Sequence, residues 1–268
     1  MYIREYVEEL YRDPRWKTNE KKVRDVVRAS YSLSHDYVIP IIALTGGPSA
    51  AKTMQVIEDY PDATFITPTK KLKSNYVNKA MTCFTRHEAL QHIEMAETVV
   101  IDEISQIELE YVAIIHLLNP KCRIICVGDV HQIPFVPYGK INYNHIKSVG
   151  VQNNLQELKA VPLDICNMIN RKYKLNYTTT SDVKHGLCIS KSPLEKFKKV
   201  PIICFNDATA KTLISQGFNC NTITTYQGSR EPVVVFYIDS AAVQSSIANK
   251  VEWIYTAMTR ATNQLVLS

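Results

Sequence analysis

The chain has 268 residues, of which 46% are hydrophobic and 21% are charged. This length and balance are typical of a soluble globular protein with two domains of ordinary size. No segment has the roughly 18 uninterrupted apolar residues of a membrane span, and the N-terminus lacks the apolar core of a signal peptide. We therefore expect an intracellular protein without a membrane span.

The net charge of +5 is small, but the basic residues are unevenly distributed. Residues 70–86 contain five basic and no acidic residues, and residues 168–200 contain eight basic and two acidic ones. Two basic segments suit a polyanion that contacts both halves of the chain, although ordinary solvated lysines give the same pattern. The seven cysteines are odd in number and form no CxxC pair, so we expect buried, reduced thiols rather than a disulfide framework or a zinc site.

The hydrophobic pattern changes at residue 38. Residues 1–37 carry apolar positions at helical spacing and predict two short helices around Asp13-Pro14. After them, short Val- and Ile-rich runs alternate with amphipathic segments, which is typical of parallel strands joined by helices. The predicted strands lie within 38–46, 63–69, 98–103, 123–129, 201–205, 221–226, 232–239 and 263–268, and the predicted helices are 52–59, 71–80, 86–95, 108–118 and 248–260.

A domain boundary is predicted near residue 152, because the segment 137–160 is polar and poor in strand signals. The chain would then consist of a short helical N-terminal extension at 1–37, a first α/β domain at 38–152 and a second at 153–268. No internal repeat or low-complexity tract interrupts this division.

A phosphate-binding loop is predicted where the first of these strands ends. The run GGPSAAKT covers Gly46, Gly47, Pro48, Ser49, Ala50, Ala51, Lys52 and Thr53. Backbone N–H groups of such a loop cradle phosphates, while Lys52 would hold the β- and γ-phosphates and the Thr53 hydroxyl would bind Mg²⁺. Ala51 stands at the second glycine of the pattern G-x-x-x-x-G-K-T, which leaves the loop possible at some backbone strain. A strand-to-helix turn with a surface lysine is the alternative interpretation.

Two further strand ends carry polar residues that suit the same site. The apolar run VVI ends in Asp102 and Glu103. Asp102 would complete the Mg²⁺ site with Thr53, and Glu103 would orient and deprotonate the attacking water. The run RIICV leads to Gln132, which could contact the γ-phosphate, whereas the adjacent His131 is expected to be structural. A solvated strand end is the alternative for the acidic pair.

Six segments in this order resemble the successive motifs of superfamily 1 helicases of alphavirus-like positive-strand RNA viruses. They are GGPSAAKT, TPTKKL, VVIDE, GDVHQIP, TITTYQG and YTAMTRAT, and the stretch KINYNH resembles a further segment of that family. The resemblance runs from about Ile41 to Ser268. It implies two RecA-like P-loop domains, with parallel sheets flanked by helices, that hydrolyse ATP or another NTP with Mg²⁺ in the interdomain cleft.

The resemblance also assigns residues to RNA and to the second domain. Thr222, Gln227 and Gly228 match the T-x-x-x-x-Q-G motif that links the nucleotide to the RNA path. Arg260 matches the arginine that reaches the γ-phosphate, a role for which a guanidinium offers several donors. The residues that match the RNA-backbone motif are Thr67, Pro68 and Thr69, followed by the basic Lys70. The implied catalytic set is Lys52, Glu103, Gln132 and Arg260, and the implied nucleotide contacts are residues 46–53 with Asp102, Gln132, Lys159, Gln227, Gly228 and Arg260.

Three features depart from the family pattern. Ser49 and Ala51 stand where the family has glycines. Lys159 is the nearest counterpart of an arginine at the start of the second domain, although an alignment shifted by one residue puts Ala160 in that place. A lysine supplies charge without the bidentate fork of a guanidinium, so these changes would slow hydrolysis. The short spacing between motifs leaves no room for large inserted domains, so strand separation would need other domains of a viral replicase polyprotein.

The leading hypothesis is an RNA-stimulated NTPase and helicase that translocates on single-stranded RNA during viral RNA replication, in replication complexes of the host cytoplasm. The resemblance also implies an RNA 5′-triphosphatase activity at the same site. The alternative is an RNA-binding or assembly module with a degenerate nucleotide site. A small P-loop kinase explains the first three motifs but has no use for TITTYQG or for the late Thr-Arg pair.

Overall fold

The computed structural model describes residues 21–30, 32–33, 37–77, 81–134, 153–239 and 251–268. The chain divides into two compact units. The first contains the described residues of 1–46, 52–130 and 134–154, and the second contains those of 47–51, 131–133 and 155–268. The helix predicted before Asp13-Pro14, the KINYNH stretch and the boundary predicted near residue 152 lie outside the described residues.

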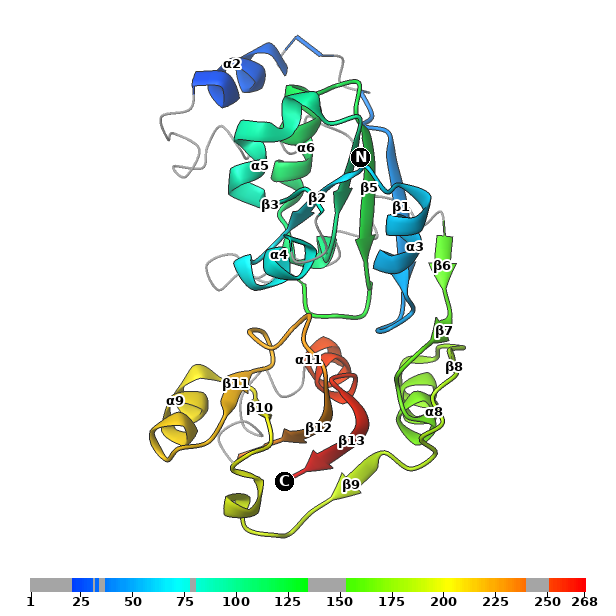
Figure 1. The fold of residues 1–268 in the computed structure, drawn as a ribbon, viewed down its shortest axis with the longest axis vertical. Helices are drawn as coiled ribbons and strands as arrows, with labels where there is room; N and C mark the ends of the chain where they lie inside the picture. Colours follow the sequence, from blue (N-terminus) through cyan, green and yellow to red (C-terminus); the bar gives the residue numbers. More distant parts are fainter. Residues whose placement is uncertain (1–20, 31, 34–36, 78–80, 135–152, 240–250) are drawn as a thin grey trace. The chain divides into compact units, whose positions relative to one another are not determined.

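The first unit is built on a largely parallel sheet of six strands (Figure 1). The strands are β1 (Ile41–Gly46), β2 (Thr64–Thr67), β3 (Cys83–Thr85), β4 (Thr98–Ile101), β5 (Arg123–Gly128) and β6 (Asn153–Leu155). Their order is β3-β2-β4-β5-β1-β6, and every pairing from β3 to β1 is parallel. Because parallel strands end at the same edge, the polar residues that follow β1, β2 and β4 lie along one edge of this sheet.

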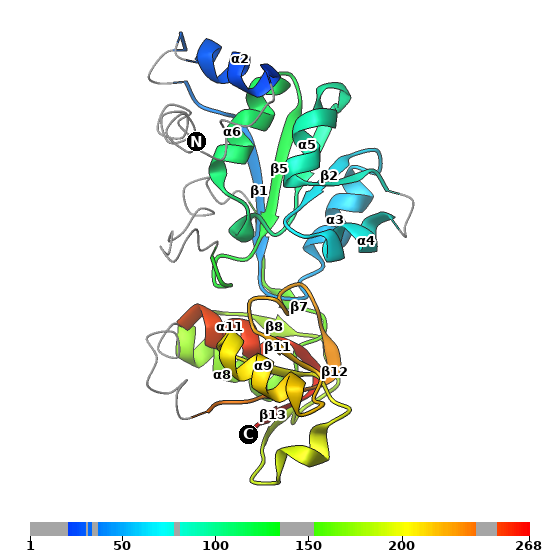
Figure 2. The same ribbon diagram turned by 90° about the vertical axis from the view of Figure 1, so that its left-hand side faces the viewer.

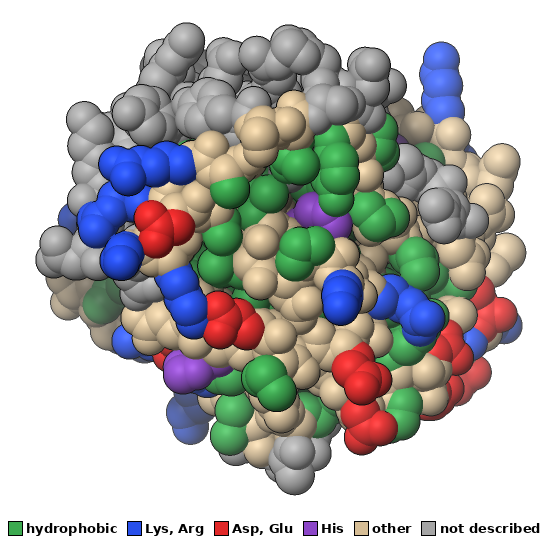
Figure 3. Space-filling model, turned by 90° about the horizontal axis from the view of Figure 1, so that it is seen from above, with side chains coloured by type: hydrophobic (Ala, Val, Ile, Leu, Met, Phe, Trp, Pro, Cys, Tyr) green, Lys and Arg blue, Asp and Glu red, His purple; other side chains and the backbone are tan. Residues whose placement is uncertain are grey.

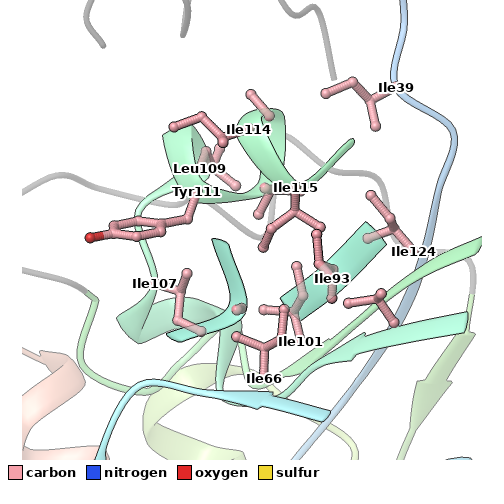
Figure 4. Packing of buried hydrophobic residues seen from close by; sticks show 14 of the residues in the cluster. Ile39, Ile66, Ile93, Ile101, Ile107, Leu109, Tyr111, Ile114, Ile115 and Ile124 are labelled. Atoms are coloured by element: carbon pink, nitrogen blue, oxygen red, sulfur yellow. The ribbon is translucent and has the colours of Figure 1, made fainter. Parts of the chain in front are cut away.

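One face of this sheet carries the main hydrophobic core. The helices of the unit are α2 (Lys21–Ser30), α3 (Lys52–Asp59), α4 (Lys70–Val77), α5 (Arg86–His92) and α6 (Leu109–Leu118), with 3-10 turns η2 (Ile93–Met95) and η3 (Ile104–Gln106). Residues of α2, α5 and α6 pack together with strand residues in one cluster (Figures 1 and 2). In Figure 4, Ile115 of α6 and Ile93 converge on the strand residues Ile101 and Ile124. Each such buried side chain contributes about 1.5–3 kcal/mol, so this core holds the sheet edge in place.

The helix α4 lies against the opposite face. Phe65 and Ile66 are adjacent in β2 and both fully buried, and alternation along a strand directs them to opposite faces. Ile66 belongs to the core with α6, whereas the Phe65 ring stacks on the Tyr76 ring of α4. The ring centroids are 4.8 Å apart and the planes differ by 26°. This contact fixes the last turn of α4 against the strand that ends at Thr67.

The second unit has its own parallel sheet. Its strands are β9 (Leu187–Ile189), β10 (Ile202–Cys204), β11 (Cys220–Thr222), β12 (Glu231–Phe236) and β13 (Ala261–Leu267), in the order β11-β10-β12-β13-β9. A separate short pair joins β7 (Glu157–Leu158) to β8 (Thr178–Thr179), and the helical elements are α8 (Leu163–Tyr173), η5 (Leu194–Phe197), α9 (Asp207–Ser215) and α11 (Val251–Met258). Helix α9 packs Ala210 and Leu213 on the sheet, and Asn206 caps its start by accepting the Thr209 N–H at 2.8 Å.

These elements confirm the predicted α/β fold class and correct two details. The segment 221–226 is predicted as a strand, but β11 ends at Thr222. The Thr222 hydroxyl accepts the N–H of Thr225 at 3.2 Å, and this local hydrogen bond turns the chain out of the sheet. The polar segment predicted to lack strands contains β6 and β7 within its described part, because exposed residues of short strands carry no apolar pattern.

Thiols and charged side chains bear on the predictions from composition. Of the seven cysteines, all are free thiols and all but Cys188 are buried. Burial raises the pKa of the Cys126 thiol to about 12, which keeps it protonated at neutral pH.

The face seen in Figure 3 carries basic and acidic side chains close to one another. Among the described residues, no helix combines the length and the apolar character needed to cross a membrane.

Candidate nucleotide and RNA site

The phosphate loop has a left-handed backbone at two positions that lack glycine. Ser49 has a φ of 58° and Ala51 has a φ of 57°. The family pattern has glycine at both positions, and glycine adopts this conformation without strain. A residue with a side chain costs about 1–2 kcal/mol there, so neighbouring contacts must hold the loop in place.

Ser49 supplies several of those contacts within the second unit. Its Oγ donates to the Pro48 carbonyl at 2.6 Å and accepts the N–H of Ala160 at 3.2 Å. Its carbonyl accepts the N–H of Lys159 at 3.0 Å. The hydroxyl therefore gives the loop a tether to Ala160 that a glycine could not provide, in addition to the backbone hydrogen bond from Lys159.

The space beside Gly47 is filled by neighbouring side chains. A Cβ at this position would lie 2.5 Å from Leu158 Cδ2 and 3.0 Å from Tyr177 Cζ. The Gly47 N–H donates to the Leu155 carbonyl at 3.3 Å. The backbone of the loop therefore approaches its neighbours closely at this glycine.

Lys52 and Thr53 begin α3, directly after the loop. Lys52 Nζ donates to the Gly46 carbonyl at 2.9 Å. Thr53 Oγ1 lies 3.4 and 3.5 Å from the two carboxylate oxygens of Asp102, which follows β4. The structure thus brings together a hydroxyl and a carboxylate from two strand–helix segments that are far apart in the sequence. Oxygen donors are the ligands that Mg²⁺ takes, so these two side chains fit the predicted metal.

Asp102 is buried and surrounded by polar groups. The Tyr76 hydroxyl of α4 donates a hydrogen bond to its carboxylate. Burial raises the pKa of Asp102, and it outweighs the lowering effects of the Tyr76 hydrogen bond, the Glu103 backbone N–H and the Lys52 charge. Burial and the Asp102 charge also raise the pKa of Tyr76, so the phenol keeps its proton and remains a donor.

Glu103 has an unusual backbone conformation at the end of β4. Its φ of 50° and ψ of 47° lie in the left-handed region, and the chain turns there into η3. Few residues other than glycine adopt this region, and strained backbone of this kind is concentrated at functional sites. Glu103 is only partly buried, unlike Asp102, which suits the predicted role of an acid that meets water.

Two predicted glutamines are in contact within the second unit. Gln227 Nε2 donates to Gln132 Oε1 at 3.1 Å, and both side chains are buried. Gln227 Oε1 is also buried and has no hydrogen-bond partner among the described residues. An amide oxygen in that state costs about 1–3 kcal/mol, and a ligand that donates a hydrogen bond would satisfy it.

Arg260 follows α11 and is 1% exposed. Its Nε donates to the Thr256 carbonyl at 2.9 Å, and its Nη2 donates to Thr259 Oγ1 at 3.0 Å. Its Nη1 donates to the Ser229 carbonyl at 3.4 Å. These acceptors are neutral. A phosphate could replace them, because its charge would make a stronger hydrogen bond to the guanidinium. Arg260 and Lys52 belong to different units.

The predicted RNA-backbone residues lie at the start of α4. Thr67 is fully buried, and its hydroxyl donates to the Thr69 carbonyl at 3.3 Å. Thr69 Oγ1 accepts the N–H of Leu72 at 3.2 Å and so caps the helix. Thr69 and Lys70 are exposed, and Pro68 is half-buried. Thr67 therefore shapes this turn, while Thr69 and Lys70 present their polar groups to solvent.

The remaining predicted residues lie in turns of the second unit. Thr222 is buried and begins the turn that leads to Gly228, which has a φ of 79°. Lys159 is exposed and pairs with Glu157. Its charge is therefore at the surface and already opposed by a carboxylate, which weakens its candidacy as a replacement for the family arginine.

Sequence reasoning missed two residues of this arrangement. Tyr76 contacts Asp102, and Thr256 Oγ1 accepts the N–H of Ile133 at 3.3 Å, next to Gln132. Tyr76 is one of 15 tyrosines, so its type alone does not single it out. Thr256 lies inside the YTAMTRAT segment, where its place one helical turn before Arg260 is the signal that could have been used.

Two parallel α/β units, a phosphate loop and an adjacent Thr–Asp pair define a P-loop protein of the NTPase class. A family model described as the viral superfamily 1 RNA helicase core domain matches residues 51–268. The chain belongs to this family of viral superfamily 1 RNA helicase core domains.

Curated relatives of the chain are longer viral replicase proteins. It is 28% identical over 247 residues to the methyltransferase/helicase/RNA-directed RNA polymerase of Helicoverpa armigera stunt virus, covering 83% of this chain and 14% of that protein. It is 25% identical over 154 residues to the corresponding protein of Nudaurelia capensis beta virus, covering 52% of this chain and 7% of that protein. The chain therefore spans at most 14% of the length of these two relatives.

Solved helicase structures share the fold at low identity. The PRRSV helicase has a TM-score of 0.68 at 15% identity and covers 85% of this chain and 52% of its own. Arterivirus nonstructural protein 10 in complex with DNA gives 0.66 at 18% identity, with 85% and 60% covered. The Pif1 helicase from Bacteroides, in complex with ADP-AlF3 and ssDNA, gives 0.58 at 10% identity, with 93% and 92% covered. At these identities the likeness concerns the fold.

Proposed function

We propose that this chain is the motor core of a viral replicase, which hydrolyses ATP or another NTP with Mg²⁺ and translocates on single-stranded RNA. The observation that carries the proposal is the Thr53 hydroxyl, 3.4 and 3.5 Å from the carboxylate oxygens of Asp102 and directly after a phosphate loop. Thr53 and Asp102 would hold Mg²⁺, which would neutralise negative charge on the phosphates when bound. Lys52 would exchange the Gly46 carbonyl for a phosphate oxygen.

The other predicted residues take roles that follow from their surroundings. Glu103 would orient the attacking water and accept its proton, because its carboxylate is partly accessible beside Asp102. Gln132 would contact the γ-phosphate. Its hydrogen bond to Gln227 would make the position of Gln227 depend on whether that phosphate is present. Arg260 would leave its carbonyl partners to stabilise charge on the transferred phosphoryl group.

RNA binding would use the start of α4 and the turn that begins at Thr222. Thr69 and Lys70 are exposed and carry a hydroxyl and an ammonium group, which suit phosphates rather than bases. We expect binding to be largely independent of sequence and to weaken steeply as salt is raised. The same phosphate site would also remove the 5′ γ-phosphate of RNA, and other domains of a replicase in cytoplasmic replication complexes would be its partners.

A phosphate-release assay tests the motor proposal. Wild-type protein is expected to release phosphate only with Mg²⁺ and faster with single-stranded RNA. Lys52→Ala should lose at least about 100-fold of this activity, because a charged donor to the transferred phosphate is removed. Lys121→Ala is the matched control, since Lys121 is an exposed lysine of the same unit after α6.

The alternative is an RNA-binding or assembly module with a degenerate nucleotide site. The left-handed Ser49 and Ala51, which replace glycines in the phosphate loop, favour this possibility. If wild type and Lys52→Ala release phosphate at the same background rate, the motor proposal fails. Retained RNA binding in that case would support the module instead.

A further inference from the structure

Tyr76 contacts both the predicted Mg²⁺ ligand Asp102 and the strand β2, which leads to the predicted RNA-binding segment. Its hydroxyl donates to Asp102 Oδ2, while Thr53 Oγ1 lies 3.4 Å from Asp102 Oδ1. Its ring stacks on Phe65, two residues before Thr67 in β2. Tyr76 is only 5% exposed, so both contacts are shielded from water. One side chain therefore touches the proposed metal ligand and the strand that leads to the proposed RNA segment.

The helix that carries Tyr76 is fixed at its start by the RNA segment. Thr69 caps α4 through Leu72, and the N–H of Lys73 donates to the Thr69 carbonyl at 3.0 Å. Lys73 also pairs with Glu88 of α5 at 2.7 Å. The helix has eight residues, so Thr69 and Tyr76 are separated by about two turns of a stiff element. A displacement at Thr69 or Lys70 would therefore move the Tyr76 hydroxyl with the helix.

We propose that Tyr76 is a positioning residue that couples RNA binding at the start of α4 to the orientation of the Asp102 carboxylate. Thr53 Oγ1 lies 3.4 Å from Oδ1 and 3.5 Å from Oδ2, and the phenol donates to Oδ2, so this hydrogen bond fixes the rotation of the carboxylate that faces Thr53, where the proposed Mg²⁺ would bind. RNA that shifts α4 would turn the carboxylate through this hydrogen bond. The inference rests on the proposed function, because it explains how RNA would stimulate that same site.

The variant Tyr76→Phe tests this coupling because it keeps the ring that stacks on Phe65 and removes only the hydroxyl. Binding of a fluorescent, non-hydrolysable ATP analogue is measured as Mg²⁺ is titrated. Loss of a group that orients a metal ligand typically costs 10–100-fold in metal affinity, so we expect the half-saturating Mg²⁺ concentration to rise about tenfold. RNA should also stimulate phosphate release by a smaller factor, while affinity for single-stranded RNA stays unchanged.

Tyr111→Phe is the matched control within the same unit. Tyr111 is 4% exposed and thus buried like Tyr76, and its hydroxyl is hydrogen-bonded to His87 Nδ1 at 2.7 Å. Its removal should leave the Mg²⁺ titration and the RNA stimulation at wild-type values. A shift of equal size in both variants would show a general effect of losing a tyrosine hydroxyl and would overturn the proposal.

The result for Tyr76→Phe can be separated from the fate of the motor proposal. If the wild type has activity that Lys52→Ala abolishes, yet Tyr76→Phe matches the wild type in Mg²⁺ titration and RNA stimulation, the coupling fails while the motor stands. Should circular dichroism show that Tyr76→Phe does not fold, Phe65→Leu replaces it. That variant keeps the hydroxyl but removes the ring that holds Tyr76 in place, so the half-saturating Mg²⁺ concentration should again rise. A wild-type Mg²⁺ titration for this variant would equally overturn the proposal.

Discussion

The phosphate loop and the turn from Thr222 to Gly228 need the same kind of backbone and obtain it differently. The turn has glycine at its left-handed position, with Gly228 at a φ of 79°. The loop has Ser49 and Ala51 at φ values of 58° and 57°. In the turn the conformation costs little, whereas in the loop it is held against strain by hydrogen bonds to residues 159–160.

This difference shows that a glycine in a motif marks a left-handed backbone conformation, which another residue can also adopt if its neighbours hold it there. Ser49 replaces the freedom of glycine with a hydroxyl that accepts the Ala160 N–H. A loop built in this way depends on its neighbours, while a glycine-based turn does not. Replacing the glycine of the turn by alanine should therefore lower the free energy of unfolding, whereas replacing Ala51 of the loop by glycine should raise it.

The largest effect is expected from Gly228→Ala. A Cβ in this left-handed turn costs about 1–2 kcal/mol, partly offset by a stiffer unfolded chain, for a net loss of about 1 kcal/mol. Because Gln227 is adjacent, we also expect phosphate release to fall about tenfold. Urea unfolding followed by tryptophan fluorescence, together with the phosphate assay, measures both quantities.

Gly217→Ala is the control for that variant. Gly217 has a φ of 85°, and a Cβ added there would have no neighbouring atom within 4 Å. This variant should lose similar stability and keep its activity. Equal loss of activity in the two variants would mean that the Gly228 effect reports stability alone.

A change of pH is expected to alter stability by a similar amount without the loss of activity, and the group responsible, Tyr226, lies inside the turn. Burial and the Glu231 charge raise the pKa of Tyr226 to about 12 from 10.0, despite the opposing Arg260 charge. The folded state holds this proton more tightly, so its stabilising contribution is complete below about pH 10 and is lost as the pH rises through about 12. Between pH 8 and pH 11, wild type should lose about 1 kcal/mol more stability than Tyr226→Phe. Parallel curves for the two proteins would contradict this.

The smallest effect is expected from Ala51→Gly. Relief of about 1–2 kcal/mol of backbone strain is largely offset by the entropy of the new glycine, so a gain of about 0.5 kcal/mol in unfolding free energy remains. Ser49→Gly should gain nothing, because it also loses the acceptor for the Ala160 N–H. Equal gains in the two variants would show that the Ser49 tether has no energetic role.

Much of the fold is predictable from the sequence because its strands are apolar and buried. The runs that form β1, β4 and β5 carry unbroken hydrophobic side chains, and the helix predicted at 52–59 coincides with α3. Helices α8 and α9 are not predicted, since their polar faces mix Asn, Lys and Thr with the apolar positions. The short strand β9 also escapes prediction, because only three residues pair and one of them is largely exposed.

The site is predictable where motif spacing fixes chemistry, and hidden where contacts are tertiary. The pairing of Thr53 with Asp102 follows from strand ends that share one edge of a parallel sheet. The Tyr76 contact depends on how α4 lies over β2, which no local pattern encodes. The hydrogen bond between Gln132 and Gln227 likewise joins segments that are remote in the sequence, so both residues are predicted but their contact is not.

The order of the first sheet has a consequence for how the protein is made. The strand β1 lies between β5 and β6 although it precedes both in the chain, and Ile41 pairs with Ile124. The ribosome releases the N-terminal part first, so the nucleotide loop emerges long before the strand that braces it. Pairing over such a separation is slow. We therefore expect nascent chains that stop before residue 128 to leave this loop open to proteases, whereas longer ones protect it.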